Sequence, residues 1–134
     1  MRELPTRIQR KRTKGDRLPN NTLCVTRPHV LSSPFKVVWS CPLGALQFAW
    51  YVYGDRRAIT YRSQGFGTRY GATCYAVGLF DAWLRQECRV NNDVANALGR
   101  LTDYDHIACW CKPTAPCHGD VLLALLAERV KEKT

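Results

Sequence analysis

One stretch near the C-terminus constrains the fold more than any other, because it joins a short apolar run, a proline-containing loop and an amphipathic run. Residues 106–111 are mostly apolar, which is typical of a buried strand. Pro113 and Pro116 interrupt both strand and helix, so the chain must turn between them. After Asp120 the apolar residues cover a wide helical face and leave charged residues for solvent. We therefore predict a strand, a loop and a helix in succession.

The junction between this strand and this helix concentrates residues that bind metals or take part in catalysis. They are Cys109, Cys111, Cys117 and His118. Cys117 and His118 come at or just before the first helical turn, where N–H groups and the helix dipole favour negative charge. A thiolate there has a lowered pKa and is a better nucleophile or ligand. An anion such as phosphate binds in the same environment.

Three interpretations of the junction remain open. The first is structural, with Cys109 in the core and His118 at the helix start. The second is a metal site formed by all four residues, which suit tetrahedral zinc, although C-x-C followed by an adjacent Cys-His pair is an unusual zinc spacing. The third is a ligand or catalytic pocket, in which Cys117 is the thiolate and His118 transfers protons. In that pocket Cys111 would line the wall, and Asp120 would orient His118 or cap the helix.

The remainder of the chain predicts strands that alternate with helices. Strands are expected at residues 22–26, as the first strand, and at 36–39 and 58–61. Residues 45–53 are expected to form a strand or a short helix, and as a strand they would pair with 58–61 in a hairpin.

Two helices are expected in the middle of the chain. Residues 73–88 have helical periodicity with Cys74 and Phe80 on one face, so Cys74 is expected in the core. Asn91-Asn92-Asp93 is typical of an N-cap and precedes a second, short helix. These elements indicate an α/β or α+β fold, a single small domain with a central sheet flanked by helices.

Length and cysteine usage bound the class of protein. The chain has 134 residues, for which we expect one domain at residues 21–134 behind a basic arm at residues 1–20. Its 7 cysteines are odd in number and clustered, which excludes the usual secreted disulfide framework and predicts reduced thiols. No apolar run reaches the length of a membrane span, and no signal-peptide core follows the charged start. We therefore expect a soluble, cytoplasmic protein without a membrane partner.

The formal net charge of +9 favours a polyanionic partner such as nucleic acid or a nucleotide. Positive residues crowd the arm, and another lies in a loop of glycines and aromatic residues at 65–71. The candidate anion-binding residues are Arg7, Arg10, Lys11, Arg12, Lys14, Arg27 and Arg69. Basic arms often bind nucleic acid, and the alternative is a solvated tail.

Motifs at both ends of the chain carry a resemblance to a known family. They are residues 6–15, Leu18-Pro19, Val25-x-Arg27-Pro28, Pro34-Phe35, the run 108–111 and the run 117–122. This set resembles domain of unknown function 4326, a family of small proteins of bacteriophages, notably of actinobacterial hosts, and of bacteria. The family usually carries Trp-Gly-Asn before Pro-Phe, where this chain has Val30-Leu31-Ser32-Ser33. The Cys-His pair at the start of a helix also resembles domain of unknown function 488.

A second local resemblance concerns the loop from Cys111 to His118, which is similar to the phosphate-binding loop of thiol phosphatases. It lacks the arginine that completes such loops, and Gly119-Asp120 stands where a positive charge is needed. Phosphatase chemistry is therefore not expected.

The resemblance to the family implies no reaction, but a phage origin fits a small basic protein in the cytoplasm of an infected host. Our first hypothesis is a protein that binds or acts on nucleotides or nucleic acid through the Cys/His loop and the basic arm. The second is a non-enzymatic protein that binds a host factor through the aromatic segment Phe48–Tyr53. The third is a module stabilised by zinc. The sequence does not decide whether the protein is an enzyme.

Overall fold

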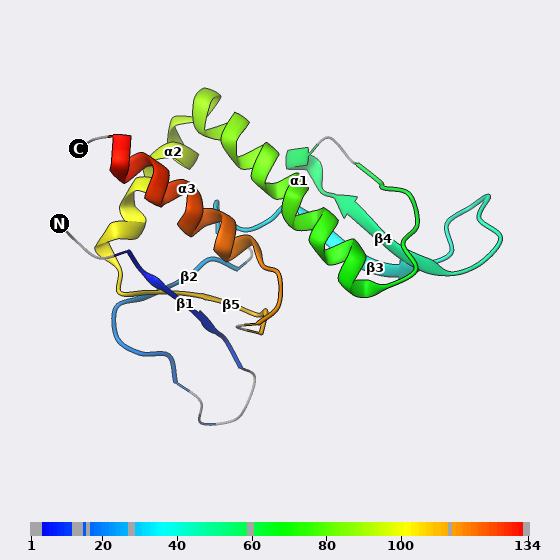
Figure 1. Cartoon of the computed structure of the whole chain (residues 1–134), viewed down its shortest axis with the longest axis horizontal. Helices are drawn as coiled ribbons and strands as arrows, with labels where there is room; N and C mark the ends of the chain where they lie inside the picture. Colours follow the sequence, from blue (N-terminus) through cyan, green and yellow to red (C-terminus); the bar gives the residue numbers. More distant parts are fainter. Residues whose placement is uncertain are drawn as a thin grey trace.

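The strand expected from residue 106, β5 (His106–Cys109), lies at the centre of a parallel sheet in the computed structural model of the chain. The structure describes residues 4–11, 15, 17–26, 29–58, 61–112 and 114–132. On one side of β5 lies β1 (Thr6–Gln9), and on the other lies β2 (Thr22–Cys24). Because these strands run in one direction, their carboxyl ends meet at the same edge of the sheet (Figure 1).

The first strand of this sheet is β1, and not the run at residues 22–26 that we expected to come first. In its register with β5, Thr6 is aligned with His106 and Gln9 with Cys109, so part of the basic arm belongs to the sheet. An edge strand makes ladder hydrogen bonds on one side and tolerates polar residues, which is why β1 has no strand-like pattern in the sequence. The run at 22–26 is present as the short strand β2.

The helices are α1 (Arg69–Val90), α2 (Asn92–Gly99) and α3 (His118–Glu132). The expected helix at 73–88, the short helix after Asn91 and the C-terminal strand–loop–helix unit are thereby confirmed, as is the α/β class. Asn91 caps α2 as expected, because its side-chain oxygen accepts a hydrogen bond from the Asp93 N–H at 3.0 Å. A one-turn 3₁₀ helix, η2 (Arg100–Asp103), follows α2 and leads to β5.

Two further strands, β3 (Phe35–Ser40) and β4 (Ala49–Gly54), pair along their whole length as an antiparallel hairpin. The strand at 36–39 and the strand alternative at 45–53 are confirmed, but these strands form a second sheet instead of joining one central sheet. β4 pairs with β3 on one edge and makes antiparallel bridges with residues 61–66 on the other, so the expected pairing of 45–53 with 58–61 is shifted along the chain to this later segment. Ala58 ends the short 3₁₀ helix η1 (Arg56–Ala58), and residues 59–60 lie outside the described part of the chain.

The buried face of α1 carries Ala72, Ala76, Phe80 and Leu84, at intervals of four residues. Cys74 was expected on this face but is exposed. With 3.6 residues per turn, position 74 lies about 200° around the helix from position 72, so the two positions face different sides. The predicted buried face was therefore wrong at Cys74, whereas Phe80 lies on the buried face as predicted.

Helix α1 contributes to two hydrophobic clusters. Ala72 and Ala76 pack with Val52 of β4 under the hairpin. Phe80 and Leu84 pack in the larger core, whose other fully buried members include Val25, Leu31, Leu98, Leu101, Ile107 and Leu122. Figure 1 shows α2 and α3 on one side of the parallel sheet, with α1 running from them to the hairpin. Among the helices of the described residues, none is both long and apolar enough to cross a membrane.

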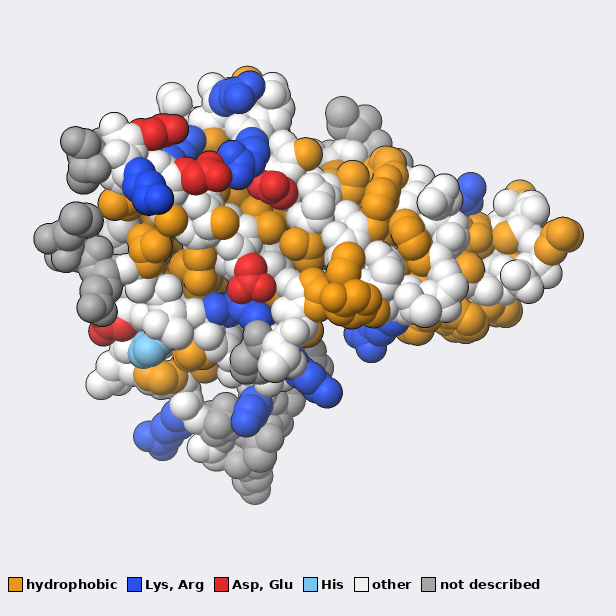
Figure 2. All heavy atoms as spheres, viewed as in Figure 1, with side chains coloured by type: hydrophobic (Ala, Val, Ile, Leu, Met, Phe, Trp, Pro, Cys, Tyr) orange, Lys and Arg blue, Asp and Glu red, His pale blue; other side chains and the backbone are white. Residues whose placement is uncertain are grey.

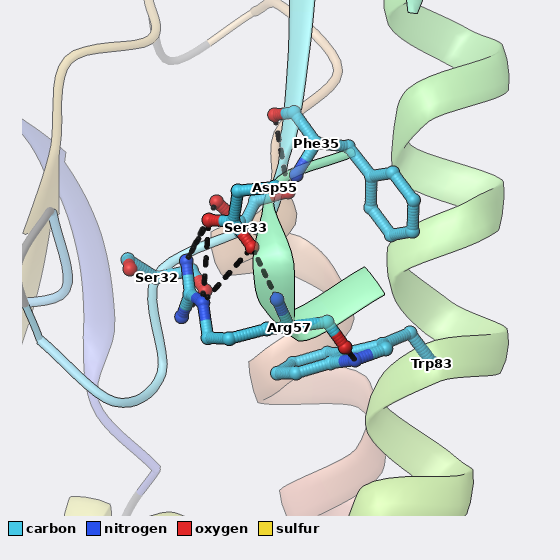
Figure 3. A network of polar contacts seen from close by, with 6 residues as sticks. All are labelled: Ser32, Ser33, Phe35, Asp55, Arg57 and Trp83. Carbon is cyan, nitrogen blue, oxygen red and sulfur yellow. Dashed lines mark hydrogen bonds and ion pairs between the residues drawn. The ribbon is translucent and has the colours of Figure 1, made fainter. Parts of the chain in front are cut away.

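A polar network around Arg57 joins the hairpin to α1 (Figure 3). The Asp55 carboxylate accepts from the Arg57 backbone N–H at 2.9 Å and pairs with its guanidinium at 3.0 Å. The same guanidinium donates to the carbonyls of Ser32 and Ser33 at 3.1 and 3.3 Å. The Arg57 carbonyl in turn accepts from the indole N–H of Trp83 at 3.2 Å. One side chain thus fixes the loop before β3 and the turn after β4, and its backbone is bonded to α1.

Candidate functional site

The junction singled out in the sequence lies at the carboxyl edge of the parallel sheet, where ligands bind in open α/β folds. β5 ends at Cys109, and α3 begins at His118. The sulfur atoms of Cys109, Cys111 and Cys117 all lie within 4.8 Å of one another, and Cys117 Sγ is 3.2 Å from Cys109 Sγ. Cys109 and Cys117 are buried, and Cys111 is half-buried. The structure therefore brings the cysteines together in one cluster, the thiol cluster.

Arg7 of β1 reaches into the loop beside the thiol cluster. Its guanidinium lies 3.7 Å from Cys109 Sγ and donates to the carbonyls of Lys112 and Ala115 at 3.2 and 3.3 Å. Its Nε atom pairs with Asp120 Oδ1 at 2.8 Å. The arginine that the loop itself lacks is thus supplied by a strand about a hundred residues earlier. Arg7 therefore closes the loop from inside, with a side chain that is 8% exposed.

The three cysteines of the thiol cluster shift one another's pKa values in opposite directions. Hydrogen bonds from Cys111 and Cys117, together with Arg7, lower the pKa of Cys109 to about 2. The hydrogen bond with Cys109 raises the pKa of Cys117 and that of Cys111. The sequence pointed to Cys117 as the thiolate because of the helix start. In the structure Cys117 Sγ does accept the Gly119 N–H at 3.3 Å, but it donates its own proton to Cys109.

His118 lies beside the thiol cluster with a defined tautomer. Its Nε2 atom is 3.0 Å from the Val25 carbonyl oxygen, which only accepts, so Nε2 carries the proton of the neutral ring. The Nδ1 atom then has a lone pair and lies 3.7 Å from Cys117 Sγ. The ring edge packs against Phe80. Asp120, which we expected to orient His118 or cap α3, has its carboxylate paired with Arg7.

A cleft of about 440 Å³ opens beside the thiol cluster, between β1, the loop after β5 and the first turn of α1. It is lined by Gln9, Arg69, Tyr70, Thr73, Trp110, Cys111, Lys112, Ala115 and Pro116. Among the described residues that line it there are two positive side chains and no carboxylate. Trp110 is 41% exposed and Tyr70 is 68% exposed, so this cleft offers aromatic surface and positive charge together.

A second cleft of about 310 Å³ lies on the β2 side of Trp110, also at Cys111. Lys36, Ser33 and His118 contribute to its wall. Arg10 is near the boundary between the two clefts, with its guanidinium 4.3 Å from the Trp110 ring centroid and bonded to Thr26 Oγ1 at 2.8 Å. Trp110 is thus at the centre of the surface around the thiol cluster.

The expected anion-binding residues are dispersed in the structure. Arg10 and Arg69 lie at Trp110 and at the first cleft, Arg7 is inside the loop, and Lys11 is exposed. Arg12, Lys14 and Arg27 lie outside the described residues. Sequence reasoning missed Trp110, Tyr70 and Lys112. The alternation of side chains along a strand contained one signal for Trp110. Cys109 and Cys111 flank Trp110 and share one face, so the Trp110 side chain is expected on the opposite face.

The aromatic segment Phe48–Tyr53 is divided between core and surface. Val52 is fully buried, while Phe48 is exposed and stacks on exposed Trp39 with ring centroids 5.9 Å apart. Figure 2 shows hydrophobic side chains over the β3–β4 hairpin.

Comparison with known families matches residues 8–128 to the family described as Domain of unknown function (DUF4326). The match covers both clefts, the thiol cluster and the hairpin. No curated protein and no solved structure matches the chain.

Proposed function

We propose that this chain, which belongs to the family of Domain of unknown function (DUF4326), binds single-stranded nucleic acid, with one nucleotide in the cleft at Trp110. The observation that carries this proposal is the composition of the cleft wall. Exposed aromatic rings stand beside two positive side chains, and no carboxylate is among the described residues of the wall. Aromatic and positive groups in one groove are the usual means of binding single strands without sequence preference.

Base stacking is the contribution of Trp110 and Tyr70. Each ring is exposed on the wall of the cleft, and stacking of one base on an aromatic side chain contributes about 1–3 kcal/mol. Arg10 lies against the Trp110 ring at 4.3 Å and limits its movement, so the stacking surface is held in place before the ligand arrives.

Phosphate binding is the contribution of Arg69 and Lys112, supported by the start of α1. Arg69 is the first residue of α1, and the N–H groups of a first helical turn lack partners within the helix. Thr68 accepts the Gly71 N–H, which fixes the helix start at the cleft. The formal net charge of +9 adds an attraction for polyanions that does not depend on base sequence.

The test is fluorescence anisotropy with a labelled oligothymidine and a duplex of the same length. Trp110→Ala is expected to weaken binding of the single strand about tenfold, as the loss of one stacked base requires. Trp39→Ala is the matched control, because Trp39 is also exposed, at 52%, but lies on the hairpin and not in the cleft. Equal effects of the two substitutions, or equal binding of the duplex, would overturn the proposal.

The salt dependence tests the phosphate contacts separately. Lys112→Ala is expected to reduce the slope of log affinity against log salt by about 0.7, the value for one phosphate of a single strand. Lys131→Ala, at the far end of α3, is expected to leave the slope unchanged. Displacement of the oligonucleotide by thymidine monophosphate at an equal phosphate concentration would instead identify a free nucleotide as the ligand.

A further inference from the structure

The thiol cluster has a composition and spacing that the proposed nucleic-acid function does not use. Cys109 comes from the end of β5, Cys111 from the loop and Cys117 from the residue before α3. Their sulfur atoms all lie within 4.8 Å of one another. The loop between β5 and α3 thus brings three possible thiolate ligands together at one point.

We propose that Cys109, Cys111 and Cys117 bind a divalent cation that prefers thiolate ligands, of the zinc class, with His118 Nδ1 as the fourth ligand. Around a tetrahedral zinc ion with Zn–S distances of about 2.3 Å, ligand sulfurs lie roughly 3.8 Å apart. The observed separations of 3.2 Å between Cys117 and Cys109 and of at most 4.8 Å within the cluster bracket this value. Small side-chain movements are therefore sufficient to accommodate the ion.

His118 has the hydrogen bond that orients a metal-binding histidine. Such residues bind through one ring nitrogen and donate the other N–H to a carboxylate or a backbone carbonyl. Here Nε2 is bonded to the Val25 carbonyl at 3.0 Å, and Nδ1 is 3.7 Å from Cys117 Sγ. The ring lies outside the group of atoms that are all within 4.8 Å, so the cysteines carry the proposal and His118 completes it.

The surroundings of the thiol cluster place a positive group next to the site. A divalent cation with three thiolates has a net charge of −1, and the guanidinium of Arg7, which also pairs with Asp120, lies 3.7 Å from Cys109 Sγ. Arg7 also binds the Lys112 and Ala115 carbonyls, which holds the loop that carries Cys111 and Cys117. The Gly119 N–H donates to Cys117 Sγ at 3.3 Å. These contacts orient the ligands in the way that outer-shell groups do in metal sites.

Access to the thiol cluster is through Cys111. This residue is half-buried and lines both clefts, whereas Cys109 and Cys117 are buried. An ion therefore reaches the site from the surface at Cys111. The sulfurs of Cys109 and Cys117 lie deeper, away from solvent.

The experiment uses the full chain, freed of metal and kept reduced, and titrates it with Co²⁺ alone and then with Zn²⁺ alone. We expect one equivalent of Co²⁺ to give thiolate-to-metal charge-transfer absorption and tetrahedral visible bands, which Zn²⁺ then removes. Cys111→Ser is expected to weaken Co²⁺ binding about a hundredfold. Cys74→Ser is the matched control, because Cys74 is exposed on α1 and outside the thiol cluster.

Thermal unfolding keeps the test informative where a buried cysteine variant folds poorly. At one fixed Zn²⁺ concentration, the Tm of the wild type and of Cys74→Ser is expected to rise by the same amount, and that of Cys111→Ser by clearly less. Absence of the charge-transfer band from folded wild-type protein, or equal Co²⁺ affinity of the two serine variants, would overturn the site. Undiminished affinity in His118→Ala would overturn the assignment of the fourth ligand. None of these readouts involves nucleic acid, so they are independent of the proposed function.

Discussion

Arg7 Nε and Asp120 Oδ1 lie 2.8 Å apart and join the first strand of the sheet to the first turn of the last helix. The two side chains differ in their surroundings, since that of Arg7 is 8% exposed and that of Asp120 is 55% exposed. The guanidinium also binds two loop carbonyls, those of Lys112 and Ala115. The pair is therefore one part of a larger arrangement in which Arg7 closes the loop around the thiol cluster.

Replacement of the two partners is expected to have unequal effects. Arg7→Ala removes the ion pair and the donor to the part-buried Ala115 carbonyl and the exposed Lys112 carbonyl, so we expect it to lower the free energy of unfolding by about 2 kcal/mol. Asp120→Asn removes an ion pair whose carboxylate is itself half-exposed and leaves the guanidinium its two carbonyl acceptors, so we expect a loss of about 0.5 kcal/mol. Urea denaturation of both variants measures the difference. Equal losses would mean that the carbonyl contacts contribute nothing.

Gly119 is required by its close approach to Arg7. A Cβ atom at this position would lie 2.9 Å from Arg7 Cδ, and Arg7 is held by Asp120 and so cannot easily move away. Gly119→Ala is therefore expected to destabilise the protein by about 1–2 kcal/mol, although alanine favours helices. Gly78→Ala is the matched control, because nothing lies within 4 Å of a Cβ there, and it is expected to stabilise by about 0.5–1 kcal/mol.

The Gly119 prediction has an internal check in the double variant. If the contact with Arg7 causes the loss, Gly119→Ala should cost almost nothing when it is introduced into Arg7→Ala. Additive losses in urea denaturation would point to a different cause, such as a change at Cys117.

The elements with strong local signals could be predicted from the sequence. Residues 106–130 were correctly assigned because the apolar run, the prolines and the amphipathic face each act within a few residues. Asn91 was assigned correctly for the same reason, since an N-cap depends on the next two or three residues. One interpretation of the sequence brings the three cysteines together, because all three lie in this one unit, and the structure does so.

The features that the sequence did not predict depend on contacts between distant segments. β1 is a strand because β5 offers it an edge about a hundred residues later, and its own residues are polar. Arg7 was assigned to a surface arm, because nothing near it indicates that Cys109 and Asp120 surround it. The pairing of β3 with β4 was missed because the short turn after residue 53 favoured a hairpin with 58–61, whereas a longer loop separates β3 from β4.

Acid is expected to remove the contribution of an ion pair between α1 and α3. The Arg85 guanidinium donates to both oxygens of Glu128 at 2.9 and 3.1 Å, which lowers the pKa of Glu128. As the pH falls, Glu128 therefore takes up a proton at a higher pH in the unfolded chain than in the folded chain. The free energy of unfolding rises with pH between these two pKa values. The contribution is complete above the pKa of an unfolded glutamate, about 4.3, and is lost as the pH falls through the lower folded value.

Glu128→Gln is therefore expected to have a lower Tm than the wild type at pH 7, and the two curves should converge in acid. Glu132→Gln is the matched control, one turn further along the same exposed side of α3, and should follow the wild type at every pH. Because the pair is exposed, high salt should also reduce the difference at pH 7. A difference that persists below pH 3 would show that Glu128 acts by packing and not by charge.

Arg57 is expected to matter for stability although its side chain is about one-third exposed. It satisfies the carbonyls of Ser32 and Ser33 and pairs with Asp55, as Figure 3 shows. We expect Arg57→Ala to lower the free energy of unfolding by about 1–2 kcal/mol. Arg57→Lys should recover less than half of this loss, because an ammonium group cannot reproduce the planar set of donors that reaches three acceptors at once.

Two further variants separate the guanidinium from the backbone of the same residue. Trp83→Phe keeps an aromatic ring on α1 but removes the N–H that donates to the Arg57 carbonyl at 3.2 Å, so we expect a loss of about 1 kcal/mol. Arg56→Ala is the control for charge, because Arg56 precedes Arg57 in η1 and is exposed, and it should change stability by less than about 0.5 kcal/mol. Urea denaturation that gives Arg56→Ala and Arg57→Ala the same loss in free energy of unfolding would mean that stability depends on net charge and not on the polar network around Arg57.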